Sequence, residues 1–110
     1  MEIKKMNEFN LITHIENQIK FSKETFGPGS RTEGVIEHIK KELEEIRENP
    51  QDIKEWIDVM ILAMDGAWRA GYTAEEICTT LKNKLEENKK RSWPDWRTAP
   101  KNKPIEHNRT

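Results

Sequence analysis

The sequence predicts an all-α fold: a four-helix bundle with a central antiparallel helix hairpin and an extended C-terminal tail. The 110-residue chain is 35% charged and 34% hydrophobic, with only 5 glycines and 5 prolines, a composition that favours helices over a sheet or a disordered chain. Its apolar residues recur at helical spacing in segments separated by glycine, proline and capping residues. Because this length suits one core, we expect a single helical domain over residues 1–97 and a flexible tail over residues 98–110.

The first two helices are predicted on either side of a glycine-rich breaker. The first is expected over about residues 7–24, where Ile12, Ile15 and Ile19 share one face. The breaker is TFGPGSR, whose glycines and proline block helix continuation. The second helix is expected over about residues 32–48, with an apolar seam formed by Ile36, Ile39, Leu43 and Ile46.

A short connection, ENPQD, joins the second helix to the third. Asn49 and Pro50 stop the second helix, and Asp52 can cap the third. A connection of only ~3–4 residues predicts that the two helices form an antiparallel hairpin. The third helix, over about residues 52–70, is apolar around much of its circumference, which predicts a central and largely buried helix.

The fourth helix begins with a capping box in the stretch TAEE, with Thr73 as the N-cap and Glu76 reaching back to it. Gly71 ends the preceding helix, and the fourth helix is expected to reach about Arg91. The remaining stretch, SWPDWRTAPKNKPIEHNRT, contains three prolines and no periodicity, so we expect an extended tail.

Charge, cysteine content and hydropathy exclude several classes of function. The 19 basic and 20 acidic residues give a net charge of −1, so there is no basic field for binding duplex nucleic acid. No apolar run approaches the ~18 residues of a membrane span, and MEIKKMNEFN lacks the apolar region of a signal peptide. A single cysteine, Cys78, fits a reducing compartment, so we expect a cytoplasmic protein.

Two pairs of acidic residues are expected to face each other across the hairpin. Glu42 and Glu45 lie three residues apart on the second helix, as Glu55 and Asp58 do on the third. Glu42 borders the apolar seam, and the stripe of Glu55 and Asp58 continues to Asp65 on an apolar helix. An unpaired buried carboxylate costs several kcal/mol, so a positive partner is expected there.

Metal ions are the partner that these acids favour. Hard carboxylate oxygens suit Mg2+ or Mn2+, and four acids can hold two ions ~3.5–4 Å apart, an arrangement that commonly activates water against a phosphoryl group. Lys40, Lys41 and Lys54 lie beside the acids around the helices and cannot all turn to that face. The alternative is that the acids are solvated, as glutamate pairs in charged helices usually are.

The chain resembles the MazG-type nucleotide pyrophosphohydrolases of the all-α NTP pyrophosphatase superfamily, whose signature is ExxE followed on the next helix by ExxD. Its matches are ELEE, with Glu42 and Glu45, and EWID, with Glu55 and Asp58, while Lys41 stands where the superfamily often has a glutamate. Within residues 21–97 it is most similar to the phage and bacterial dATP/dGTP pyrophosphohydrolase branch, which includes MazZ. That similarity rests on FGPGSRTEGVIEHIKKELEEI, EWIDVMILAMDGAWRAG and KNKLEENKKRSWPDWR.

This resemblance implies Mg2+-dependent hydrolysis of dGTP or dATP between the α and β phosphates, which yields the monophosphate and pyrophosphate. Glu42, Glu45, Glu55 and Asp58 would hold two or more ions, with Mn2+ as a possible substitute. Glu45 and Glu42 are the catalytic candidates, since a carboxylate such as Glu45 can take the proton of the attacking water.

Substrate contacts are expected from a second set of residues. Lys84, Asn88 and Arg91 advance by four and three residues and so share one helical face, which is either a phosphate-binding face or a solvated basic stripe. Asp65 could bind a further metal or a ribose hydroxyl, or pair with Arg69, and a role in the site is favoured. Arg31 could meet the nucleotide, although its loop could equally well only hold the first helix. His14, His38 and His107 have no ligand spacing and receive no role.

The apolar third helix also predicts self-association, as a homodimer or a homotetramer, with Trp56 or Trp68 near the interface. The competing function is a small helical oligomerisation or partner-binding module without catalysis, in which the acids are merely solvated. Turnover that depends on Mg2+ separates the two.

Overall fold

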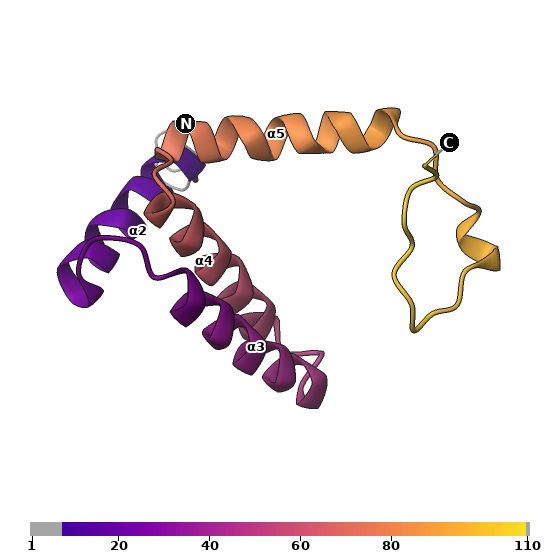
Figure 1. The fold of residues 1–110 in the computed structure, drawn as a ribbon, viewed down its shortest axis with the longest axis horizontal. Coiled ribbons are helices and arrows are strands. Elements are labelled where there is room, and N and C mark those ends of the chain that lie inside the picture. The colour runs from indigo at the N-terminus through magenta and orange to yellow at the C-terminus, as the bar shows by residue number, and fades with distance from the viewer. Residues whose placement is uncertain (1–7, 110) are drawn as a thin grey trace. The chain divides into compact units, whose positions relative to one another are not determined.

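The computed structural model describes residues 8–109, and this range contains no strand. It has four α-helices and one turn of 3-10 helix, so the predicted all-α class and helix count are confirmed for the described residues (Figure 1). These elements are α2 (Leu11–Phe26), α3 (Thr32–Glu48), α4 (Ile53–Arg69), α5 (Ala74–Lys90) and η1 (Trp96–Thr98).

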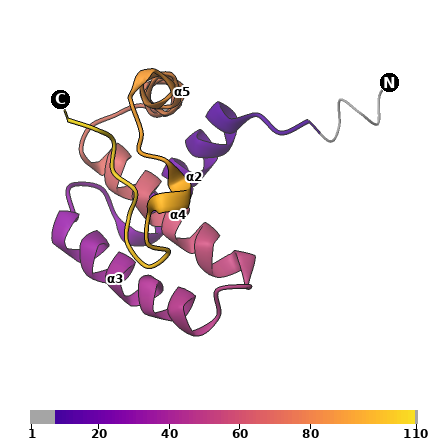
Figure 2. The same ribbon diagram turned by 90° about the vertical axis from the view of Figure 1, so that its right-hand side faces the viewer.

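The chain forms two compact units that divide between Cys78 and Thr79. In the first unit α4 packs against α3 along its length and against α2. Helices α3 and α4 run in opposite directions, which confirms the predicted antiparallel hairpin (Figure 2). The hairpin therefore places the end of α3 beside the start of α4.

Local side-chain caps set the helix boundaries. Helix α2 begins at Leu11, later than predicted, because the side chain of Asn10 accepts a hydrogen bond of 3.0 Å from the Thr13 amide. The expected start, Asn7, lies outside the described residues. Asp52 caps α4 by accepting a 3.0 Å bond from the Lys54 amide, as predicted.

The predicted capping box at the start of α5 is confirmed. The Thr73 amide donates to the Glu76 carboxylate over 2.9 Å, and the Glu76 amide donates back to the Thr73 hydroxyl over 3.1 Å. Before it, Gly71 adopts a φ of 109°, a left-handed backbone that favours glycine after a helix end.

The prediction that the third helix is largely buried is wrong for this chain. Helices α2 and α3 cover only part of α4, and the apolar residues with more than a third of their surface exposed are Ile53, Trp56, Ile57, Met60 and Ile61. Trp68, by contrast, is buried. The uncovered side is named here the exposed α4 face. No helix among residues 8–109 is long and apolar enough to cross a membrane.

The second unit contains the rest of α5, η1 and the C-terminal segment. The Asn108 amide donates to the Ser92 carbonyl over 2.8 Å, and the Trp93 ring lies edge-on to the His107 ring at 5.9 Å. The Trp93 indole also donates to the Asn88 carbonyl over 2.8 Å. These contacts close the segment between Ser92 and Asn108 into a loop, and the flexibility of residues 98–110 stays a prediction.

Candidate active site

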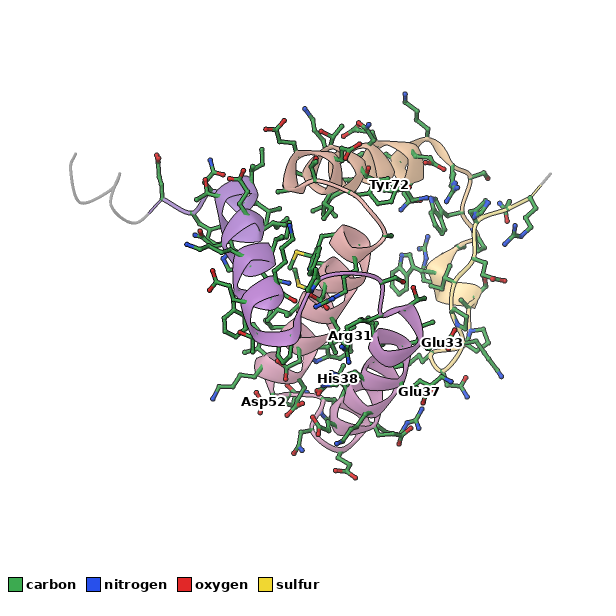
Figure 3. All side chains as sticks on the ribbon, turned by 60° about the vertical axis from the view of Figure 1, so that its left-hand side comes forward. Arg31, Glu33, Glu37, His38, Asp52 and Tyr72 are labelled. Atoms are coloured by element: carbon green, nitrogen blue, oxygen red, sulfur yellow. The ribbon has the colours of Figure 1, made fainter. Side chains whose placement is uncertain are left out.

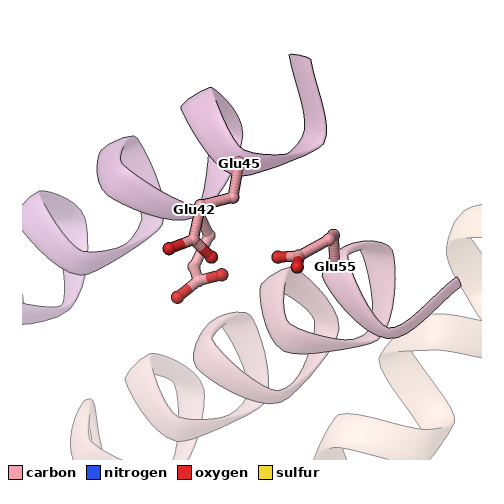
Figure 4. A group of neighbouring side chains, drawn as sticks. All are labelled: Glu42, Glu45 and Glu55. Carbon is pink, nitrogen blue, oxygen red and sulfur yellow. The ribbon is translucent and has the colours of Figure 1, made fainter. Parts of the chain in front are cut away.

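Three carboxylates meet near the turn of the hairpin, where α3 ends and α4 begins (Figure 4). Glu42, Glu45 and Glu55 each offer an oxygen, and these oxygens all lie within 4.8 Å of one another. The two glutamates of α3 are one turn apart on one face, and the short connection brings the first turn of α4 against them. Helix spacing and the hairpin thus build the acid cluster, which is defined as Glu42, Glu45 and Glu55.

The acid cluster contains carboxylate oxygens that protein groups do not satisfy. Glu42 is 8% exposed, and the Oε2 atoms of Glu42 and Glu55 are buried with no hydrogen-bond partner in the described part of the chain. The basic side chain that contacts the cluster is that of His38, whose Nε2 lies 3.4 Å from Glu42 Oε1. One histidine cannot balance three carboxylates, so the cluster has a strong demand for positive charge.

Two carboxyl groups of the cluster have raised pKa values. A hydrogen bond shared with Glu45, then burial and the negative charge of Glu45, raise the pKa of Glu55 to about 7. The same causes, together with the charge of Asp58, raise the pKa of Glu42, while His38 opposes the shift. A bound cation would remove this repulsion and release the protons that the cluster holds.

A cleft of about 700 Å³ adjoins the acid cluster, between α2, α3 and α4. Glu42 and the exposed Asp58 line one part of it, and Asp65 and Arg69 another. Asp58 is not among the three clustered carboxylates, although its charge acts on Glu42. The other lining side chains include the polar Gln18, Arg31 and His38 and the apolar Phe21, Phe26, Val35, Ile61 and Leu62.

Asp65 pairs with Arg69, which was one of the three possibilities given for it. The Arg69 Nε donates to Asp65 Oδ2 over 2.8 Å, and Trp68 Nε1 and Ser22 Oγ donate to Asp65 Oδ1 over 2.7 and 2.5 Å. Burial alone would raise the pKa of Asp65, but hydrogen bonds from Ser22, Arg69 and Trp68 and the charge of Arg69 hold that pKa below its usual value. Asp65 is therefore an ionised partner within a buried network.

The remaining predicted substrate residues lie in two places. Arg31 precedes the first turn of α3 and lines the cleft near His38 (Figure 3). Lys84, Asn88 and Arg91 belong to the second unit, where Arg91 donates to Asn88 over 3.0 Å and to Glu87 over 2.6 Å. Lys84 and Asn88 lie one turn apart on α5 and Arg91 directly follows its last residue, and the contact of all three with substrate stays a prediction.

A family model for dATP/dGTP pyrophosphohydrolases matches residues 14–110. The chain belongs to this family. The match includes both acid pairs and the cleft, and the family is one of diphosphatases that use divalent metal ions in general. Comparison with curated proteins and with solved structures gives no match.

Sequence reasoning about this dATP/dGTP pyrophosphohydrolase family member missed two features of the cleft. His38 received no role, yet its position four residues before Glu42 brings its ring to that carboxylate. Ser22 and Arg69 are also buried beside the cleft. The i, i+4 spacing was a readable signal for His38, whereas only the packing of α2 on α4 brings Ser22 to Arg69.

Proposed function

We propose that the protein hydrolyses dGTP or dATP to the monophosphate and pyrophosphate with the help of bound Mg2+. The observation that carries this proposal is the acid cluster, whose buried and unpartnered carboxylate oxygens adjoin the cleft in a member of this family. Three hard oxygen donors with too little positive charge around them match the ligand preference of Mg2+.

Glu42, Glu45 and Glu55 would hold the metal ions, and Asp58 would complete the set. The Oε2 atoms of Glu42 and Glu55 fit this role, because each is buried and has no hydrogen-bond partner in the described part of the chain, so each is available to a cation. Two bound Mg2+ ions, or Mn2+ in their place, would neutralise phosphate charge and lower the pKa of a water molecule.

The protein's own groups then direct the attack at the α-phosphorus. We assign Glu45 as the base that takes the water proton on a carboxylate oxygen, since it belongs to the acid cluster and no basic side chain pairs with it in the described contacts. Glu42 lines the cleft, and it is the second catalytic candidate. His38, next to Glu42, supplies a positive charge when protonated.

The nucleotide would lie in the cleft with its phosphates toward the acid cluster. The apolar lining suits a base, because burying an aromatic ring against Phe21, Phe26 and Leu62 removes it from water. Arg31 offers a guanidinium to the anionic substrate, and Lys84, Asn88 and Arg91 are the further candidates for phosphate contact. Both oxygens of Asp65 already accept hydrogen bonds, so we do not extend the proposal to Asp65.

The exposed α4 face supports a homodimer or a homotetramer. Its apolar residues, such as Trp56 at 52% and Met60 at 54% exposure, lie on the same helix as two residues of the proposed metal site. A second copy of the chain would bury this surface, as apolar faces on soluble proteins usually require.

The test is release of pyrophosphate against release of phosphate from every dNTP and NTP, with Mg2+ and with EDTA. We expect Mg2+-dependent release of pyrophosphate confined to dGTP and dATP, and its loss in Glu55→Gln. Glu44→Gln is the matched control, because Glu44 is exposed and pairs only with Arg47 among the described contacts. Release of no product from any nucleotide would contradict the proposal and favour the non-catalytic module.

A further inference from the structure

Arg69 makes the most extensive set of polar contacts among the described side chains. Its side chain is 2% exposed, and its three nitrogens donate to four partners. The Nε bonds Asp65 over 2.8 Å, and Nη2 bonds the Ser22 hydroxyl over 3.0 Å. The guanidinium also lies 4.4 Å from the centre of the Trp68 ring. Arg69 is thus fixed in one position by α2 and α4.

The two remaining bonds of Arg69 hold the loop between α2 and α3. Its Nη1 donates to the carbonyls of Gly27 over 3.0 Å and of Gly29 over 2.9 Å. Both glycines have left-handed φ values, 85° and 94°, and this backbone turns both carbonyls toward one donor. The loop is therefore tied to α4 by bonds that span 42 and 40 positions of the sequence.

This tie lies two residues before Arg31, which lines the cleft. Arg31 is the residue before α3 and has no side-chain cap bond, so the loop backbone is what determines where its guanidinium can reach. Because Arg31 is exposed and Arg69 holds the backbone just before it, the position of Arg31 depends on Arg69.

We propose that Arg69 is a positioning residue that locks the loop at Gly27 and Gly29 and so presents Arg31 to the nucleotide in the cleft. This inference rests on the proposed function for the nucleotide, while the locking itself is a property of the chain without substrate. Lysine cannot replace arginine here, because a single ammonium cannot reach Asp65, Ser22 and both carbonyls at once.

The first experiment measures the lock by hydrogen–deuterium exchange of the free protein at the amides of Gly27 and Val35, which donate to the carbonyls of Lys23 and Arg31 at the two ends of the loop. In Arg69→Lys, which keeps the charge beside Asp65, these amides should exchange about tenfold faster because two charge-assisted hydrogen bonds are lost. The matched control is Arg47→Lys on the exposed surface, which should leave them unchanged. Unchanged exchange in Arg69→Lys overturns the proposal.

The second experiment is a double-mutant cycle of Arg69→Lys and Arg31→Ala in steady-state hydrolysis of dGTP. Arg69→Lys alone should raise KM about fivefold with kcat within about twofold, and it should change KM by less than about twofold when Arg31 is already alanine. Equal effects of Arg69→Lys in both backgrounds overturn the inference.

A second variant tests the same lock without changing Arg69, in case Arg69→Lys does not fold. Gly29→Ala leaves the buried charges untouched but strains the left-handed backbone, and it should raise KM in the same way as Arg69→Lys. If the wild type hydrolyses no nucleotide, the proposed function fails while the exchange experiment still decides whether Arg69 locks the loop. A Gly29→Ala protein with wild-type exchange and wild-type KM overturns the proposal.

Discussion

Glu45 near the end of α3 and Glu55 in the first turn of α4 bring carboxylate oxygens within 4.8 Å of each other. Ten residues of sequence separate them, and the hairpin turn alone makes them neighbours. Their hydrogen bond and repulsion raise the pKa of Glu55 to about 7. The cluster therefore stores unfavourable electrostatic energy that a cation, a proton or a neutral substitution can relieve.

The first prediction concerns removal of one charge from the cluster. Glu55→Gln should abolish hydrolysis while raising the Tm of the protein in EDTA, because it removes repulsion along with a metal ligand. Differential scanning calorimetry and the pyrophosphate assay measure the two effects. The exposed Glu44→Gln should change neither. A lower Tm for Glu55→Gln would show that the carboxylate stabilises the metal-free fold.

Stability without metal should depend on pH through Glu55. Its folded pKa of about 7 lies above the ordinary 4.5, so the folded state binds a proton that the unfolded state has lost. The free energy of unfolding in EDTA should therefore fall as pH rises from 4.5 to 7 and then level off. The lowered pKa of Asp65 acts only below 3.8, outside this range. Urea unfolding at several pH values measures the trend, which should be smaller in Glu55→Gln.

Added Mg2+ should stabilise the folded protein. A ligand that binds only the folded state at 100 times its Kd adds about 2.7 kcal/mol to the free energy of unfolding. We expect a rise in Tm with Mg2+ in the wild type and a much smaller rise in Glu42→Gln. Differential scanning fluorimetry measures both. An equal rise in both proteins would place the ion elsewhere.

Removal of Asp65 should destabilise the fold. Asp65→Ala leaves the guanidinium of Arg69, 2% exposed, without its carboxylate, and breaking a buried pair from one side costs about 3–5 kcal/mol. Urea unfolding measures this loss. The exposed pair of Arg47 and Glu44 supplies the comparison, because Glu44→Gln should cost less than about 1 kcal/mol. Equal costs would mean that burial adds nothing to the Asp65 pair.

Self-association should depend on the exposed α4 face. Trp56→Lys puts a charge in the middle of the apolar residues and should shift the protein from a dimer or tetramer to a monomer. Light scattering at micromolar concentration gives the mass. Lys54→Ala, a change of an exposed polar residue on the same helix, should leave the mass unchanged. A wild-type protein of monomeric mass would contradict the predicted oligomer.

Local chemistry explains which parts of the fold could be predicted. Asp52 and the pair of Thr73 and Glu76 act within one turn of their own helix, so these caps can be predicted from the neighbouring residues alone. The acid pairs are also local, since i, i+3 spacing fixes their common face on each helix. The predicted start of α2 was too early. The residue that caps the helix is Asn10, and it lies in a polar stretch whose apolar residues do not mark where the helix begins.

The sequence by itself determined the helices, the hairpin and the glutamates that would share a face, because periodicity, caps and a short connection are interactions over a few residues. Only the tertiary structure decided that Glu55 joins Glu42 and Glu45 while Asp58 lies exposed beside the cleft, and that Arg69 reaches Gly27 and Gly29. It also left much of α4 uncovered in the single chain. These outcomes depend on how helices far apart in sequence pack, and packing is set by the shape and volume of many side chains together rather than by any local pattern.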